Sequence, residues 1–249
     1  MTSSILLKNA CIELPQATFD FHRPLPKFCG LLFLGGRAPS DAWTRTLLAT
    51  LDAPSIYAVD RGVATCHRLG LAPDVLLGDA DSATGEDWAW GEAHAKHIER
   101  HPVEKDFTDT QLALAHVRTE RAKHAECATL LLLGAFGGRF DHAYSTIFSA
   151  AQVDAPCVLA DERETIVYLH PGDTLTLSCH AAPKALSLLP MTAIVRGVTT
   201  HGLHWPLTDA TLTQSMPNAV SNVLEKDTKT CTISIRDGGL AVYLCWVNR

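Results

Sequence analysis

The chain has 249 residues, of which 47% are hydrophobic and 19% charged, so it can bury a real core in one large domain or two small ones. Its net charge of −6 excludes the basic footprint of a nucleic-acid-binding protein. No apolar run approaches the ~20 residues of a membrane span, and the first ten residues lack the pattern of a secretory signal. We therefore expect a cytoplasmic protein without a membrane or nucleic-acid partner.

The cysteines do not form a recognisable metal or disulfide framework. There are eight of them, and none belongs to a CxxC pair, which argues against a zinc knuckle. We expect buried, reduced thiols.

Short apolar strands alternate with helices through the first 151 residues. Residues 1–28 are predicted to be irregular because Pro15, Pro24 and Pro26 interrupt any long element. Strands are then predicted at residues 31–34, 55–59, 75–77, 101–103 and 129–133, and helices at 41–51, 63–69, 88–99, 106–120 and 140–151. This alternation favours a parallel α/β sheet.

The pattern changes near residue 154, after which strands follow one another without a convincing helix. They are predicted at residues 158–160, 166–169, 174–177, 185–188, 193–195, 231–236 and 240–247. We therefore expect an α/β protein of two domains: a parallel, Rossmann-like α/β domain over residues 1–154, and an antiparallel β-sandwich over residues 155–249.

Six aspartates follow predicted strands or begin predicted helices. They are Asp60, Asp79, Asp81, Asp106, Asp109 and Asp141. Ligands of open α/β sheets bind at the carboxyl ends of the strands, so these carboxylates are expected to converge there. Because clustered carboxylates repel one another, we expect Mg²⁺ among them, held by carboxylates and substrate phosphates.

Each of these aspartates also has a purely structural interpretation, because aspartate is common at helix N-termini and in turns. Lys105–Asp109 is also typical of a helix start. Gly78–Ser82, with the sequence Gly-Asp-Ala-Asp-Ser after a buried strand, is more typical of a metal site. The coincidence of both segments favours the metal interpretation.

Glycines fill the predicted turn between the strand 129–133 and the helix 140–151. Gly134–His142 has the sequence Gly-Ala-Phe-Gly-Gly-Arg-Phe-Asp-His. Backbone N–H groups at such a helix N-terminus bind phosphate and Arg139 adds a forked cation, but a tight turn alone would also explain the glycines. The GxxxxGK[ST] and GxGxxG patterns do not occur, which argues against a P-loop or a dinucleotide site.

These motifs, in this order, resemble the thiamine pyrophosphokinase family. That family's pattern comprises an ADGG-like strand end, GDxDS, KDxTD, GGRxDH, and a GLx(W/Y) stretch followed by Ser-Asn. The corresponding segments are residues 59–62, 78–82, 105–110, 137–142, 202–207 and 221–222. The resemblance implies the two-domain fold that the strand and helix pattern also predicts.

The resemblance implies transfer of diphosphate from ATP to the hydroxyl of thiamine, giving thiamine diphosphate and AMP, by a Mg²⁺-dependent homodimer with shared active sites. The implied catalytic residues are Asp79, Asp81, Asp106, Asp109 and Asp141, and Asp79, Asp81 and Asp109 would hold the metal. The implied ATP-binding residues are Asp60, Ser82, Lys105, Thr108, Gly137, Gly138, Arg139 and His142. The implied thiamine-binding residues are Trp205, Ser221 and Asn222.

Trp205 has two interpretations. A tryptophan face suits the thiazolium cation of thiamine, but a tryptophan in a β-strand is more often part of a core. Three other positions depart from the family pattern: Arg61 replaces a glycine, Gln111 a common acidic residue, and His204 a common lysine.

Two further functions stay open. One is a diphosphokinase on the same scaffold that acts on a pterin or another alcohol. The other is a non-catalytic nucleotide-binding protein that kept the fold, which the loss of a metal-binding aspartate would favour; none is lost here.

Overall fold

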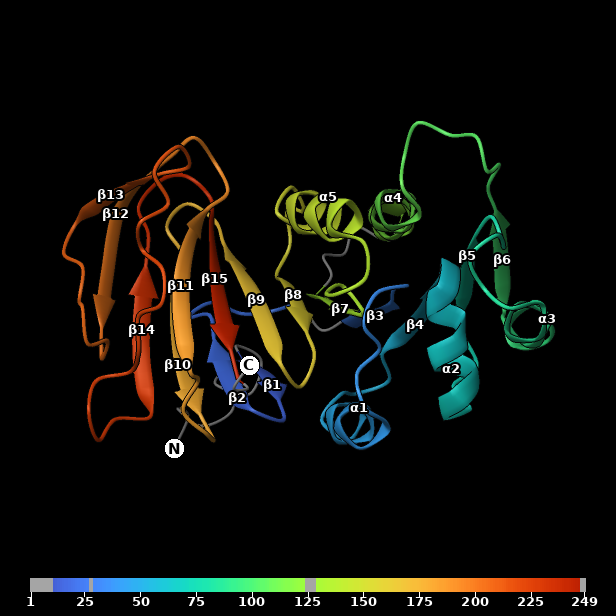
Figure 1. Cartoon of the computed structure of the whole chain (residues 1–249), viewed down its shortest axis with the longest axis horizontal. Coiled ribbons are helices and arrows are strands. Elements are labelled where there is room, and N and C mark those ends of the chain that lie inside the picture. Colours follow the sequence, from blue (N-terminus) through green and yellow to red (C-terminus); the bar gives the residue numbers. More distant parts are fainter. Residues whose placement is uncertain (1–10, 27–28, 124–128, 247–249) are drawn as a thin grey trace. The chain divides into compact units, whose positions relative to one another are not determined.

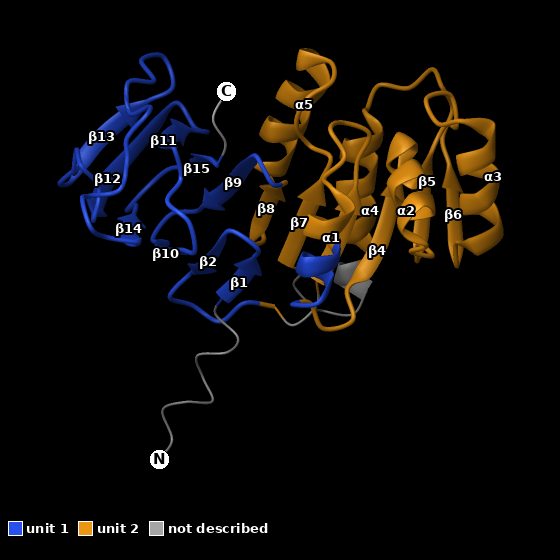
Figure 2. Cartoon of the chain, turned by 60° about the horizontal axis from the view of Figure 1, so that its bottom comes forward, with its two compact units in different colours: residues 1–25, 45–50, 162–249 blue, residues 26–44, 51–161 orange. Residues whose placement is uncertain are grey.

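The computed structural model describes residues 11–26, 29–123 and 129–246, which form a mixed α/β fold with two sheets (Figure 1). The chain divides into two compact units (Figure 2). The parallel unit consists of Pro26–Thr44 and Leu51–Asp161. The antiparallel unit consists of Met1–Leu25, Arg45–Thr50 and Glu162–Arg249.

Six strands run through the parallel unit in the order β8-β7-β3-β4-β5-β6, and neighbouring strands are parallel. They are β3 (Cys29–Phe33), β4 (Ser55–Val59), β5 (Val75–Gly78), β6 (His97–Arg100), β7 (Thr129–Leu133) and β8 (Cys157–Ala160). Every residue of β5, β7 and β8 is buried, as expected of strands covered on both faces.

Helices cover both faces of these strands. Figure 1 shows α4 and α5 on one face and α2 and α3 on the other. The helices are α1 (Asp41–Leu48), α2 (Val63–Leu69), α3 (Gly85–His94), α4 (Asp109–Lys123) and α5 (Phe140–Ala150), with a 3₁₀ turn, η2, at Asp60–Gly62. This arrangement brings the carboxyl ends of β3, β4, β5 and β7 to one edge, where the aspartates and glycines follow.

The antiparallel unit contains two sets of antiparallel strands. One has the order β1-β2-β10-β14-β12-β13, and the other has β15 between β11 and β9. The strands are β1 (Cys11–Leu14), β2 (Ala17–Asp20), β9 (Glu164–Leu169), β10 (Thr174–Cys179), β11 (Ala185–Pro190), β12 (Ile194–His201), β13 (Ala210–Thr213), β14 (Thr230–Ser234) and β15 (Leu240–Cys245). No helix follows α5 in the described residues, as the sequence predicts.

The prediction that residues 1–28 are irregular is wrong for their described part. β1 and β2 form a hairpin, with Leu14 opposite Ala17, and β2 pairs with β10. Pro15 lies in the two-residue turn of this hairpin, where it interrupts no strand. The predicted domain boundary at residues 154–155 stays a prediction; the compact units change at residues 161–162.

Two elements at the edges of the sheets also differ from the prediction. The helix expected at residues 88–99 starts earlier, at α3, because Thr84 caps it by accepting a hydrogen bond from the backbone N–H of Asp87. It ends at His94, and the following strand is β6 rather than residues 101–103. β6 is an edge strand with mostly exposed residues, and β13, also an edge strand, was not predicted. Edge strands need no apolar face on each side, so their sequences carry a weak signal.

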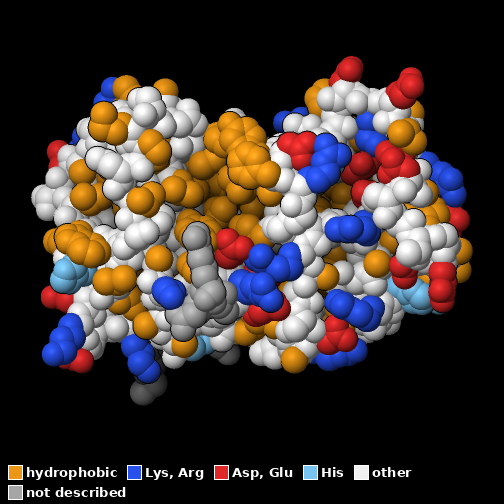
Figure 3. All heavy atoms as spheres, viewed as in Figure 1, with side chains coloured by type: hydrophobic (Ala, Val, Ile, Leu, Met, Phe, Trp, Pro, Cys, Tyr) orange, Lys and Arg blue, Asp and Glu red, His pale blue; other side chains and the backbone are white. Residues whose placement is uncertain are grey.

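The described cysteines are all free thiols, and Cys127 lies outside the described residues. Among the described helices, none has both the length and the apolar character needed to cross a membrane. Figure 3 shows acidic and basic side chains intermixed over the α2-to-β6 part of the parallel unit.

Candidate functional site

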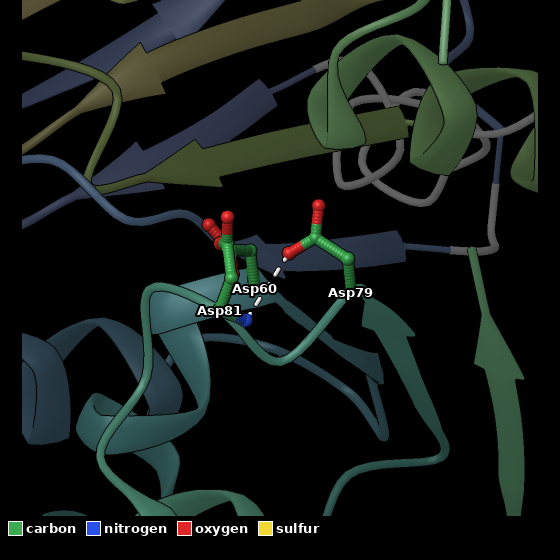
Figure 4. Close-up of side chains that lie close together, drawn as sticks. All are labelled: Asp60, Asp79 and Asp81. Atoms are coloured by element: carbon green, nitrogen blue, oxygen red, sulfur yellow. Dashed lines mark hydrogen bonds between the residues drawn. The ribbon is translucent and has the colours of Figure 1, made fainter. Parts of the chain in front are cut away.

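Three carboxylates meet at the carboxyl ends of β4 and β5. Asp60 follows β4, and Asp79 and Asp81 follow β5, which pairs in parallel with β4. One carboxylate oxygen from each of the three lies within 4.8 Å of the others, and Figure 4 shows the side chains converging. The predicted convergence of these aspartates therefore holds for Asp60, Asp79 and Asp81.

The backbone around this cluster adopts conformations that few residues accept. Gly78 has φ +146°, and a Cβ atom there would lie 3.1 Å from the Cα of Asp60. Asp60 and Ala80 have φ values of 51° and 68°, in the left-handed region. The glycine thus permits β5 to turn tightly against Asp60, and such strain is typical of functional sites.

One oxygen of the cluster receives no hydrogen bond from the described part of the chain. The hydroxyl of Ser82 donates a hydrogen bond to Oδ2 of Asp60 at 2.5 Å, and the backbone N–H of Asp81 donates to Oδ1 of Asp79 at 3.2 Å. Oδ1 of Asp60 is buried and has no hydrogen-bond partner among the described residues. A buried carboxylate oxygen is costly unless it is paired or binds a metal, so the donor set fits a hard cation such as Mg²⁺.

Lys105 links this cluster to the start of α4. Its Nζ lies 2.6 Å from Oδ2 of Asp79 and 3.2 Å from Oδ1 of Asp109, and all three side chains are largely buried. Burial raises the pKa of Asp79, but hydrogen bonds from Lys105 and Asp81 outweigh it and leave that pKa lowered. Burial lowers the pKa of Lys105, but its two carboxylate partners raise it overall. Lys105 is therefore a fixed positive charge.

Asp81 and Asp109 hold their protons more strongly than an ordinary aspartate, because the pKa of each is raised. The pKa of Asp81 is raised first by its hydrogen bond with Asp79 and then by burial. The pKa of Asp109 is raised by burial, which outweighs its contact with Lys105. Neighbouring negative charge contributes in both cases, as expected where like charges crowd.

Thr108 and Gln111 begin helix α4 with reciprocal hydrogen bonds. The Oγ1 atom of Thr108 accepts from the N–H of Gln111 at 3.3 Å, and Oε1 of Gln111 accepts from the N–H of Thr108 at 2.9 Å. This is a capping box, a motif in which glutamine and glutamate can both accept the backbone hydrogen bond. It explains how Gln111 can cap the helix at a position where the family often has an acidic residue. Asp106 is exposed and lies outside the Asp60–Asp79–Asp81 cluster.

Two glycine-rich loops pack backbone against backbone beside β3 and β7. The N–H of Gly36 donates to the carbonyl of Gly134 at 2.8 Å, and a Cβ atom on Gly36 would lie 2.4 Å from that oxygen. Gly137 and Gly138 both have positive φ, +71° and +69°. The glycines thus permit close approach, and the loop 134–138 delivers the chain to the N-terminus of α5.

Arg139 and Asp141 form an exposed pair at the first turn of α5. Nε and Nη2 of Arg139 donate to the two oxygens of Asp141 at 3.1 and 2.5 Å. The N–H of His142 also donates to Oδ1 of Asp141, at 3.0 Å. The carboxylate of Asp141 is therefore hydrogen-bonded to Arg139 and His142, and it is not one of the three clustered carboxylates. Its catalytic role stays a prediction.

An ion pair between the half-buried Arg37 and the buried Asp161, which the sequence did not predict, holds the glycine loops. Nε of Arg37 lies 2.8 Å from Oδ2 of Asp161, whose exposed fraction is 0%. The N–H of Arg37 donates to the carbonyl of Phe136 at 2.5 Å. Asp161 directly follows strand β8, so the signal that singled out Asp60 and Asp79 was also present here.

In the antiparallel unit, two hydrogen bonds join Trp205 and Asn222. The N–H of Trp205 donates to Oδ1 of Asn222 at 3.2 Å, and Nδ2 of Asn222 donates to the carbonyl of Trp205 at 2.7 Å. The Trp205 side chain is 59% exposed, so its interpretation as a core residue is wrong. His204 packs edge-on against it, with ring centroids 4.4 Å apart.

Ser221 is held in a strained turn beside Asn222. Its φ is 60°, and its N–H donates to Oγ of Ser187 at 3.0 Å. The structure thus brings the three predicted thiamine-binding residues into one neighbourhood, with an aromatic face open to solvent.

Comparisons with known proteins agree on one family. The family model "Thiamin pyrophosphokinase, catalytic domain" matches residues 48–159, and "Thiamin pyrophosphokinase, vitamin B1 binding domain" matches residues 174–240. A thiamine pyrophosphokinase of Bacillus subtilis is 26% identical over 169 residues, which cover 67% of this chain and 76% of that protein. Thiamine pyrophosphokinase 1 of Oryza sativa is 24% identical over 165 residues, or 65% of this chain and 62% of that one.

A solved structure shares the fold. The crystal structure of the Bacillus subtilis thiamine pyrophosphokinase aligns with a TM-score of 0.72 and 23% identity, covering 89% of this chain and 100% of that one. The two family models fall on the motifs that carry the resemblance, one on the acidic segments and the other on the Trp205 region. The chain belongs to the thiamine pyrophosphokinase family.

Proposed function

We propose that this chain is a thiamine diphosphokinase, which transfers diphosphate from ATP to the hydroxyl of thiamine. The observation that carries the proposal is the cluster of Asp60, Asp79 and Asp81 on a chain of this family. One buried oxygen of this cluster has no hydrogen-bond partner within the described ranges. The oxygen of thiamine attacks the β-phosphorus, the bond from that phosphorus to the α–β bridging oxygen breaks, and AMP leaves. The hydroxyl proton passes to a carboxylate of the GDADS or KDFTD segments.

The side chains of the parallel unit would position the triphosphate. Asp60, Asp79 and Asp81 would hold Mg²⁺, with Asp109 close by through Lys105. When bound, Mg²⁺ neutralises phosphate charge. Lys105 fixes the orientation of Asp79, and the N–H groups of Gly137 and Gly138 offer donors for phosphate oxygens. Arg139 can exchange its contact with Asp141 for a phosphate oxygen, because an exposed ion pair contributes little stability.

Trp205 would bind thiamine through its exposed face, supported by Asn222 and Ser221. A tryptophan ring attracts a cation such as thiazolium.

We further propose that the parallel unit is a Rossmann-like nucleotide domain and the antiparallel unit a β-sandwich, with the boundary near residues 154–155. The working form would be a cytoplasmic homodimer with shared active sites.

The identity of the group that ATP donates tests this proposal. With ATP labelled at the β-phosphorus, the label is expected to move to thiamine together with the γ-phosphate, and AMP is expected to appear. Release of ADP would overturn diphosphate transfer. Transfer to a pterin but not to thiamine would overturn the acceptor. Hybrid dimers of Trp205→Ala and Asp79→Asn protomers should regain activity if the sites are shared.

A further inference from the structure

Arg61 stands where the family pattern has a glycine, directly after a residue of the carboxylate cluster. It lies in the turn η2 between Asp60 and Gly62. A Cβ atom on Gly62 would lie 1.8 Å from the carbonyl oxygen of Phe33, so this turn is pressed against the end of β3. The backbone position of Arg61 is therefore fixed at the edge where the carboxyl ends of β3 and β4 meet.

The guanidinium of Arg61 is oriented by a single backbone contact. Its Nη2 donates a hydrogen bond to the carbonyl of Gly35, and the side chain is otherwise exposed. A guanidinium carries five N–H donors, so most of them remain available. Gly35 is followed by Gly36, which bonds to Gly134 of the second glycine loop. Arg61 thus lies where the acidic cluster adjoins the glycine loops.

The other basic side chains of these segments are already paired with carboxylates. Arg37 pairs with Asp161, Lys105 with Asp79 and Asp109, and Arg139 with Asp141. Arg61 differs, because no carboxylate within the described ranges pairs with it. A polyphosphate that enters this acidic edge needs cations, and Arg61 offers one without first breaking an ion pair.

We propose that Arg61 binds an oxygen of the nucleotide triphosphate, as a further phosphate-binding residue of the site. The inference rests on the proposed function. Its contact with Gly35 holds the guanidinium in place, and the planar fork suits two phosphate oxygens.

Equilibrium binding of inorganic triphosphate with Mg²⁺, measured by calorimetry, tests the assignment without catalysis. Arg61→Gln should weaken binding about 10-fold, the loss typical of a charge-assisted hydrogen bond. Arg61→Lys should lose less, because it keeps the charge but not the fork. Arg68→Gln is the matched control: Arg68 is also an arginine bonded to a backbone carbonyl, that of Pro39, but it pairs with Asp41. It should bind triphosphate as the wild type does.

In the AMP-release assay, Arg61→Gln should raise KM for ATP by a similar factor, with KM for thiamine and the melting temperature unchanged. Equal triphosphate binding by Arg61→Gln and the wild type would overturn the assignment. A fall in melting temperature with equal rises in KM for ATP and thiamine would also overturn it, because Arg61 would then only stabilise the Gly35 loop. A wild-type chain that binds neither triphosphate nor ATP would overturn the proposed function itself.

Discussion

Replacing Trp205 with alanine tests whether the antiparallel unit supplies the thiamine site. The ring is 59% exposed, and of the roughly 150–250 Å² that an aromatic side chain can bury, a flat ligand on one face would cover about 75 Å². At about 25 cal/mol per Å² this is about 2 kcal/mol. A cation–π contact at an exposed site adds about 0.5–1 kcal/mol. The sum is about 2.4–3 kcal/mol, so the expected rise in KM for thiamine is about 60- to 150-fold.

Steady-state kinetics with each substrate varied in turn provide the assay. KM for ATP should change little, because the proposed ATP ligands lie in the parallel unit. The folded state should survive, since an exposed ring contributes less than about 1 kcal/mol to stability. Trp205→Phe should retain part of the affinity because it keeps an aromatic face.

Met216→Ala is the matched control, because Met216 is another exposed apolar side chain of the antiparallel unit. It should leave both KM values unchanged. Equal rises in both KM values for Trp205→Ala, or a chain that unfolds at room temperature, would refute the placement of thiamine on this ring.

Asp81→Asn should lower turnover by at least about two orders of magnitude while circular dichroism stays unchanged, because it removes a carboxylate from the proposed metal cluster; near-normal turnover would contradict the cluster's role. Thr108→Ala should destabilise the protein by about 1 kcal/mol in urea unfolding through loss of the α4 cap, and an unchanged midpoint would argue against the capping box. Burial raises the pKa of Asp173, but hydrogen bonds from His170 and Arg23 outweigh it and lower this pKa from 3.8 to about 2. Asp173→Asn should therefore cost about 2 kcal/mol above pH 4, a loss that fades as the pH falls towards 2, whereas the exposed Asp237→Asn should cost less than about 0.5 kcal/mol at neutral pH.

Buried elements were the easiest to predict from the sequence. The predicted strands at 55–59 and 129–133 and the helix at 63–69 have the same bounds as β4, β7 and α2. The two strands are largely apolar runs, and each of the three elements is followed by a glycine or an aspartate, so the local sequence marks both the buried element and its end. The hairpin β1–β2 and the edge strand β6 were missed because they are short and partly exposed, and their pairing depends on distant residues.

The family was predicted from its motifs, and the comparisons confirm it. The convergence of the clustered carboxylates was predictable because it depends on strand ends, as for Asp60 and Asp79. The contacts of Lys105 with Asp79 and of Arg37 with Asp161 join residues 26 and 124 positions apart. No local pattern encodes such distances, so these pairs needed the folded chain. The complete list of site residues stays a prediction.

The hairpin at the start of the chain affects the order in which the protein can fold during synthesis. β2 hydrogen-bonds to β10, so residues 17–20 leave the ribosome more than 150 residues ahead of their partners at 176–179. At roughly 5–20 residues per second, this hairpin waits many seconds with an open edge while the parallel unit is completed. A fragment that begins after residue 154 lacks the hairpin altogether and leaves the edge of β10 unpaired, which invites aggregation. Expression of the antiparallel unit therefore calls for residues 11–25 to be supplied with it.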